Sequence, residues 1–165
     1  MLAYDEYRSP QGAMLLAATP KGLAGAYFKG QKYFPKKRGW QREWKRDPGH
    51  PVLKRAKREL AEYFSGRRRR FSVALDPQGT PFQRAVWKQI AKVGFGETLT
   101  YGELARRAGR PGSARAAGAA TGRNPLSVVV PCHRILGSNG ALTGYAGGLA
   151  RKRALLELES LTTGV

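Results

Sequence analysis

The order of apolar and polar positions in the first part of the chain predicts a hairpin followed by a helix. Residues 13–18 and 23–28 are almost entirely apolar, and the Gly- and Pro-containing segment between them is typical of a tight turn. Apolar residues then recur at helical spacing from Leu53 to Phe64, and Gly66 can end that helix. We therefore expect a small unit in which a sheet packs against one helix.

A second set of patterns places a boundary near residue 76. Residues 29–51 are basic and have little periodicity, so we expect a loop there, whereas residues 71–75 alternate like a strand. Asp76-Pro77-Gln78-Gly79 is a turn cluster. The expected fold class is α+β, with a small N-terminal α/β domain at residues 1–75 and a mostly helical domain at residues 76–165.

The second part of the chain contains the pattern of a helix-turn-helix. Thr80-Pro81 is typical of an N-cap followed by the first residue of a helix. A short helix is then expected over residues 101–108, a glycine-bearing turn over 109–112, and a second helix over 114–120 with Ser113 as its cap. Two short helices joined by a turn are usually ordinary core packing, so this pattern alone does not establish DNA binding.

Two details of the second helix favour contact with a nucleic acid. The helix is almost entirely alanine and glycine, so its backbone can approach another surface closely. Arg115 is its one long side chain and lies near its N-terminal end, where side chains can reach bases. The alternative is that Arg115 is a surface residue that touches only phosphate.

The one cysteine of the chain follows an apolar run that predicts a buried strand. Val128, Val129 and Val130 are β-branched, Pro131 cannot donate to a ladder, and Cys132 comes next, followed by a histidine and an arginine. Basic neighbours lower the pKa of a thiol and increase its nucleophilicity at neutral pH. A lone cysteine is nevertheless most often a small buried apolar residue. A Gly-rich loop and a closing amphipathic helix over residues 151–161 complete the chain.

Composition narrows the function classes. Among 165 residues there are 30 Lys and Arg against 11 Asp and Glu, a net charge of +19, which indicates a polyanionic partner, with nucleic acid the leading candidate. The densest basic runs are Lys36-Lys37-Arg38 and Arg67-Arg68-Arg69-Arg70. The single cysteine suits a reducing cytoplasm, and we expect neither a membrane span nor a signal peptide. With only two histidines besides that cysteine, we expect no zinc site.

Taken together, the motifs resemble those of the O6-alkylguanine-DNA alkyltransferases, also called methylated-DNA–protein-cysteine methyltransferases. The resemblance covers nearly all of residues 80–160 in order and spacing, whereas residues 1–75 match only in general shape. The motifs that carry it are Phe95-Gly96-Glu97, Thr100-Tyr101-Gly102, Ala114-Arg115-Ala116, Gly122-Arg123-Asn124-Pro125, Pro131-Cys132-His133-Arg134, Gly144-Tyr145-Ala146-Gly147-Gly148-Leu149 and Leu155-Leu156-Glu157-Leu158-Glu159.

The resemblance implies a catalytic set. Cys132 would accept an alkyl group from O6 of guanine, or O4 of thymine, irreversibly and once. His133 would act on the thiol as a base through a water, and Glu159 would orient and polarise His133. Asn124 would brace the turn between the recognition helix and the active-site segment. Tyr101 would assist nucleotide rotation and donate to the guanine edge.

The resemblance also implies a set of base contacts. Arg115 would occupy the space that the flipped base leaves in the stack. The carbonyls of Cys132 and Ile135 would accept from the guanine amino group. The backbone N–H of Ala146, beside Tyr145, would face O6. The implied partner is double-stranded DNA containing O6-alkylguanine, bound by a monomer without a cofactor, since the protein itself is the acceptor.

Other functions stay open at this stage. A non-catalytic lesion binder or architectural DNA protein would use the same helix with an unreactive thiol. A transcription regulator would favour a palindromic site and a dimer, and a cysteine hydrolase would turn over repeatedly. The order of the motifs favours the alkyltransferase.

Overall fold

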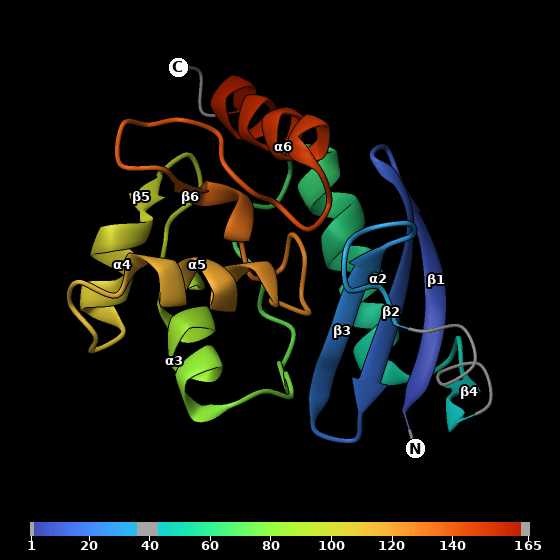
Figure 1. Ribbon diagram of the computed structural model, residues 1–165. Coiled ribbons are helices and arrows are strands. Elements are labelled where there is room, and N and C mark those ends of the chain that lie inside the picture. Colours follow the sequence, from blue (N-terminus) through green and yellow to red (C-terminus); the bar gives the residue numbers. More distant parts are fainter. Residues whose placement is uncertain (1, 36–42, 163–165) are drawn as a thin grey trace.

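The computed structural model describes residues 2–35 and 43–162, and its first part is a four-stranded sheet (Figure 1). The strands are β1 (Ala3–Ser9), β2 (Gly12–Thr19), β3 (Gly22–Phe28) and β4 (Lys45–Arg46), in the order β3-β2-β1-β4. The predicted hairpin is confirmed as β2 and β3. The sequence patterns missed β1, and also the short β4, which pairs parallel to β1 within the expected loop. The basic run at residues 36–38 lies outside the described residues.

One helix, α2 (Pro51–Phe64), packs against this sheet as the apolar spacing predicts. Leu53, Ala56, Leu60 and Tyr63 are its buried apolar positions. Ser65 is the C-cap of the helix, and Gly66 follows with φ +81°, a conformation that glycine adopts without steric cost.

The strand expected at residues 71–75 does not form. Glu59 of α2 is buried, and its Oε1 accepts the backbone N–H groups of Ser72 at 2.9 Å and Val73 at 3.1 Å. These donors are therefore not available for a sheet ladder. What remains is an isolated parallel bridge between Leu75 and Leu23 of β3.

The remainder is mostly helical, and the mixed α+β fold class is confirmed. Figure 1 shows α3, α4 and α5 on one side of the molecule, the sheet on the other and α6 at the edge between them. The elements are α3 (Pro81–Ile90), β5 (Leu99–Thr100), α4 (Tyr101–Arg107), α5 (Ala114–Gly122), the 3-10 helix η1 (Cys132–Arg134), β6 (Ile135–Leu136) and α6 (Leu149–Thr162), with β5 and β6 paired in parallel.

The start of α3 and the helix-turn-helix follow the sequence prediction closely. The Thr80 side chain accepts from the backbone N–H of Gln83 while the Gln83 side chain accepts from the Thr80 N–H, which forms a capping box. Gly109 and Gly112 in the α4–α5 turn have φ of +88° and +83°. Ser113 occupies the N-cap position of α5, but its side chain makes no capping hydrogen bond.

The strand expected at residues 128–132 is wrong. Val128 has φ +72°, which breaks extended geometry, and the thiol begins η1 instead. The physical reason is Asn124, whose Nδ2 donates to the Val130 carbonyl at 2.9 Å and whose Oδ1 accepts from the Leu126 N–H at 3.0 Å. The valines are still buried, because this compact turn lies inside the core.

Candidate functional site

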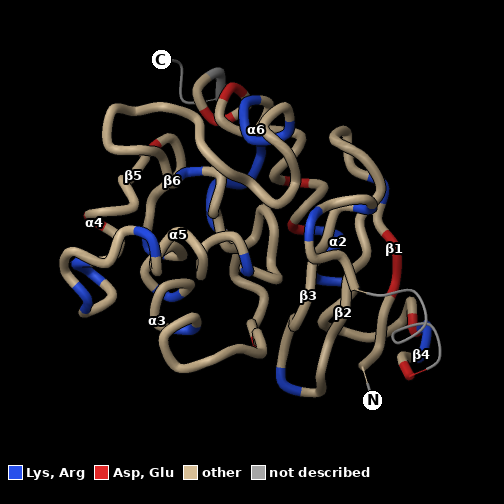
Figure 2. Tube along the Cα trace, in the orientation of Figure 1, with Lys and Arg blue, Asp and Glu red and all other residues tan. Residues whose placement is uncertain are grey.

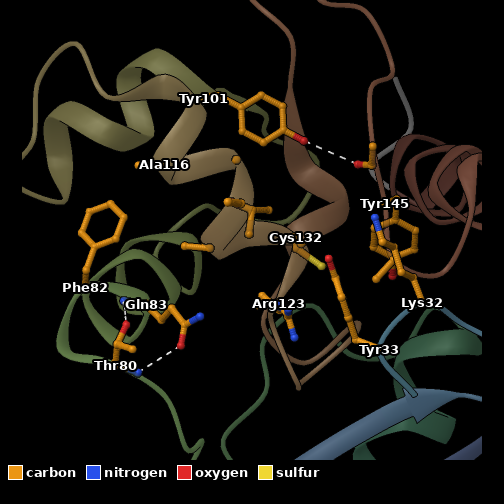
Figure 3. Close-up of a pocket in the computed structure, with 17 residues that line it drawn as sticks. Lys32, Tyr33, Thr80, Phe82, Gln83, Tyr101, Ala116, Arg123, Cys132 and Tyr145 are labelled. Atoms are coloured by element: carbon orange, nitrogen blue, oxygen red, sulfur yellow. Dashed lines mark hydrogen bonds between the residues drawn. The ribbon is translucent and has the colours of Figure 1, made fainter. Parts of the chain in front are cut away.

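A cavity of about 740 Å³ lies between helices α3, α4 and α5 and the segments that carry Tyr33 and Tyr145, and Cys132 is among the residues that line it (Figure 3). Tyr101 of α4, Tyr145 and Ala146 line the same cavity, so the structure brings these four candidate residues together. Small residues of α5 form another wall, namely Ala116, Gly118, Ala119 and Ala120. The other candidates do not line the cavity, namely Arg115, Asn124, His133, Ile135 and Glu159.

The Cys132 thiol is buried, with 4% of the residue exposed. Burial raises its pKa to about 11, although the Asn124 side chain and the positive charge of Lys152 act in the opposite direction. This corrects the expectation that basic neighbours in sequence lower the thiol pKa. Arg134, two positions on, binds Glu159 instead of approaching the sulfur.

His133 and Glu159 form the pair that the resemblance implies. His133 is fully buried in η1, and its Nε2 lies 2.7 Å from Oε2 of Glu159 in α6. Burial lowers the pKa of His133 even though Glu159 opposes this, so the ring is neutral at pH 7. A neutral ring that donates from Nε2 carries no proton on Nδ1. Among the described residues, that Nδ1 has no hydrogen-bond partner.

Glu159 is held as a carboxylate by neighbours that sequence reasoning did not assign to the site. Arg134 donates from Nε to Oε1 and from Nη2 to Oε2, both at 2.9 Å, and Tyr63 of α2 donates to Oε2 at 2.7 Å. Burial alone would raise the pKa of Glu159, but the hydrogen bonds from His133 and Arg134 outweigh it and lower the pKa to about 2. The helical spacing marked Tyr63 only as a core residue.

Asn124 lies where the resemblance places it, between α5 and the thiol. It is buried, and its hydrogen bonds to the backbone of Leu126 and Val130 set the path of the chain into Cys132. A single side chain thus fixes the geometry between the helix-turn-helix and the thiol.

Lys152 of α6 is a second buried residue that the sequence patterns did not single out. Its Nζ donates to the carbonyls of Ile135 at 2.6 Å, Thr143 at 2.7 Å and Gly144 at 3.3 Å. Burial lowers its pKa to about 8. The Ile135 carbonyl, expected to accept from guanine, therefore already has one donor, and only its second lone pair can accept another.

The two tyrosines of the cavity differ in their surroundings. The Tyr145 hydroxyl is buried beside the side chains of Cys132 and Ser127. Tyr101 Oη makes long contacts to the carbonyls of Thr143 and Gly144, at 3.4 Å and 3.5 Å. Burial raises the pKa of both phenols, so both are protonated donors at neutral pH.

Arg115 is exposed on α5 and is not among the residues that line the cavity. The exposed positions of α5 near it are alanines, which leaves the helix backbone accessible. Figure 2 shows further lysines and arginines on α6, on the α4–α5 turn and at the β2–β3 turn. The basic charge is thus spread over the molecule and is not confined to one helix.

The described residues contain neither a metal-binding cluster of side chains nor a membrane-spanning helix. No group of three or more His, Cys, Asp or Glu side chains within residues 2–35 and 43–162 is arranged to hold a metal ion. Within the same ranges, no helix has the length and apolar character needed to cross a membrane.

Comparison with protein-family models gives two matches that cover nearly the whole chain. Residues 81–161 match the DNA-binding domain of 6-O-methylguanine DNA methyltransferase. Residues 2–77 match the ribonuclease-like domain of 6-O-methylguanine DNA methyltransferase.

Individual proteins give the same result. The methylated-DNA–protein-cysteine methyltransferase of Mycobacterium tuberculosis strain H37Rv is 45% identical over 96% of this chain and 93% of the relative. That of Methanosarcina acetivorans is 43% identical over 94% of this chain and 97% of the relative. The crystal structure of M. tuberculosis OGT in complex with DNA has a TM-score of 0.87 and 43% identity, covering 97% of this chain and 94% of that one. Because full-length relatives and both family models agree, the chain belongs to the methylated-DNA–protein-cysteine methyltransferase family.

Proposed function

We propose that this protein repairs DNA by transferring an alkyl group from O6 of guanine, or O4 of thymine, to the Sγ of Cys132. The observation that carries the proposal is a buried thiol that opens onto a cavity and is backed by the buried His133–Glu159 pair. The names of the relatives support the reaction, and the DNA complex of the M. tuberculosis protein supports DNA as the partner.

The chemistry begins with removal of the thiol proton. His133 is neutral and has a free Nδ1, so it can accept that proton, through a water as the family resemblance implies. The imidazolium that forms is stabilised by the Glu159 carboxylate 2.7 Å away. Because the resting pKa of Cys132 is about 11, the base is needed at neutral pH.

Transfer is then a displacement at the alkyl carbon. The Sγ–C bond forms as the C–O6 bond breaks, and guanine leaves with the bonding electron pair and takes up a proton. Donors that face the leaving oxygen lower the barrier as its charge develops. We assign this role to the Tyr101 hydroxyl and the backbone N–H of Ala146, both in the lining of the cavity. The thioether product is stable, so each molecule acts once.

Access to the thiol requires the nucleotide to leave the duplex. An O6-alkyl group within stacked DNA is out of reach of a side chain, and base flipping costs a few kcal/mol, less for a damaged pair. We propose that α5 enters the groove through its Ala/Gly face and that exposed Arg115 fills the space left in the stack. Both α5 and Arg115 lie within residues 81–161, the part of the chain that matches the DNA-binding family model.

The remaining parts of the proposal concern assembly. We infer a monomer that needs no cofactor, because the acceptor, the base and the carboxylate all come from one chain. We also propose that residues 1–75 and 76–165 are the two domains, the second of which carries DNA binding and transfer.

The test is mass spectrometry after incubation with a duplex oligonucleotide that contains one O6-methylguanine. The tryptic peptide spanning residues 124–134 should gain one methyl group on Cys132, stoichiometrically and only once. Cys132→Ala is the matched control: it should bind the same duplex without any mass gain. If the wild-type protein binds the lesion and the peptide mass is unchanged, the protein is a lesion binder and the alkyl-transfer proposal is refuted.

A further inference from the structure

The cavity that holds Cys132 has a wall that the family motifs do not include. Two of its lining residues, Lys32 and Tyr33, come from the segment after β3, whereas all the others lie at residue 80 or beyond. In Figure 3 Tyr33 extends from the side of the sheet into the cavity, toward the region of Cys132. The sheet part of the molecule therefore contributes directly to the reaction pocket.

The segment that carries Tyr33 is hydrogen-bonded both to the end of β3 and to residues near the cavity. The Gln31 side chain accepts from the Phe28 N–H at 2.8 Å and from the Ser127 hydroxyl at 3.3 Å. The backbone N–H of Lys32 donates to the carbonyl of Ala146 at 3.0 Å. Tyr33 thus directly follows Lys32, whose backbone is hydrogen-bonded to the loop that carries Ala146.

Tyr33 itself adopts an unusual conformation. Its φ is +62°, in the left-handed region, and Tyr33 and Val128 are the two non-glycine residues with positive φ in the described ranges. Such a conformation in a bulky residue is strained and persists when its surroundings fix it, often at ligand sites. Tyr33 is 45% exposed, so burial in the core does not account for it.

Arg123 is the contact that holds the ring. Its guanidinium carbon lies 3.8 Å from the centroid of the Tyr33 ring, and Lys32 Nζ lies 5.2 Å from the same centroid. Stacking of a cation on an aromatic face is attractive and fixes the orientation of the ring. Because Arg123 directly follows α5 and precedes Asn124, the contact joins the sheet side of the pocket to the recognition helix.

From these observations we propose that Tyr33, held by Arg123, is a specificity-determining residue that limits the size of the alkyl group able to reach Cys132. This inference rests on the proposed alkyl transfer. The lining from α5 consists of small residues, so the partly exposed Tyr33 ring is one of the bulky side chains that bound the cavity. A methyl group fits beneath such a wall with little contact, whereas a benzyl group requires the ring to move.

The test compares transfer rates from O6-methylguanine and O6-benzylguanine placed at the same position of one oligonucleotide. Because the DNA is shared, any loss of DNA affinity cancels in the ratio of the two rates. Tyr33→Ala should raise the benzyl-to-methyl ratio by about tenfold, the discrimination expected from one pocket wall. Tyr33→Phe keeps the ring and should stay within about twofold of the wild-type ratio.

Two further variants distinguish the effect of the Tyr33 ring from the effect of the backbone conformation at position 33. Tyr33→Gly removes the ring and relieves the positive φ, so it should match Tyr33→Ala if the ring is the determinant. Arg123→Ala should shift the ratio in the same direction but less, while Arg58→Ala, an exposed arginine on α2, should leave it unchanged.

The outcomes distinguish this inference from the proposed function. If methyl transfer to Cys132 occurs in every variant and the ratio does not change in Tyr33→Ala or Tyr33→Gly, the wall is refuted and the transfer proposal stands. Equal slowing on both substrates also refutes the wall. If the wild-type protein transfers neither group, the proposed function itself fails.

Discussion

Arg134→Met tests whether the buried carboxylate of Glu159 depends on one arginine. In the wild-type protein Arg134 makes two 2.9 Å hydrogen bonds to Glu159 and donates a third from Nη1 to the Val93 carbonyl at 2.6 Å. Methionine retains most of the volume but none of the donors. The carboxylate would then be buried among neutral partners, which include His133, Tyr63 and the Gly96 N–H.

The magnitude follows from two routes. Removing one partner of a buried ion pair costs about 3–5 kcal/mol in the free energy of unfolding. The difference between the ordinary Glu159 pKa of 4.5 and its pKa of about 2 in the protein corresponds to about 3 kcal/mol, and this is shared between His133 and Arg134. We therefore expect Arg134→Met to lose about 3 kcal/mol at pH 7, the lower end of the range for a broken buried ion pair.

The same reasoning fixes the pH dependence. A carboxyl group whose pKa is lowered by folding contributes its stabilisation above pH 4.5 and loses it as the pH falls toward 2. Without Arg134 the pKa of the buried Glu159 rises, so the carboxyl group is protonated more easily. The destabilisation caused by burying its negative charge therefore falls as the pH decreases. The difference in stability between wild type and Arg134→Met should therefore be largest near pH 7 and narrow toward pH 4.

Urea denaturation at pH 7 and pH 4 measures both effects. Arg134→Lys, which keeps the charge but not the two-pronged contact, should lose less than Arg134→Met. Adding Glu159→Gln to Arg134→Met should recover part of the loss, because no buried charge remains. A cost within about 0.5 kcal/mol of that of a surface substitution, or a stability difference that does not change with pH, would refute the reasoning.

Three further predictions concern the thiol, the recognition helix and a helix cap. The rate of Cys132 alkylation by iodoacetamide should keep rising between pH 7 and pH 10, since the thiol pKa is about 11; a plateau by pH 8 would contradict this value. Arg115→Ala should slow repair of duplex DNA far more than reaction with free O6-benzylguanine, and equal losses on both would remove Arg115 from base flipping. In reversible thermal denaturation, Thr80→Ala should lower the free energy of unfolding by about 1 kcal/mol, whereas Thr80→Ser should be nearly neutral. An unchanged unfolding midpoint for Thr80→Ala would mean that the capping box does not contribute to stability.

Local signals predicted well wherever neighbours in sequence are also the physical partners. Thr80-Pro81 sets the start of α3 because cap and helix are adjacent, and Gly109 and Gly112 mark a turn because their own φ values require glycine. The β2–β3 hairpin follows the same logic. The resemblance, and not periodicity, paired His133 with Glu159; the two side chains are in contact in the structure, while their roles stay predictions.

The failures occurred where a distant side chain decides the local structure. The valines before Cys132 have strand propensity, but Asn124 binds their backbone and bends it. Residues 71–75 lose their ladder donors to Glu59, which is more than ten positions away. Tyr63 contacts Glu159 across 96 positions, and no helical pattern contains that information.

Adjacency in sequence also misled the prediction of the thiol pKa. Arg134 is two residues from Cys132, yet its charge is directed at Glu159, and the burial that raises the pKa depends on the whole fold. Lys152, twenty positions away in the chain, is the cation that does favour the thiolate. Composition and motif therefore pointed to Cys132 as the candidate nucleophile but could not give the ionisation state of its thiol.

The buried, protonated state of Cys132 bears on how long a single-use protein survives before it meets a lesion. With a pKa of about 11, about one molecule in ten thousand carries a thiolate at pH 7. Oxidants and soft metal ions react with thiolates, so the protonated, buried thiol reacts more slowly with them before the protein meets a lesion. Because each molecule reacts once, every molecule whose Cys132 is oxidised leaves one alkylated base unrepaired. The burial that keeps the Cys132 thiol protonated therefore also protects protein that has not yet reacted from oxidation.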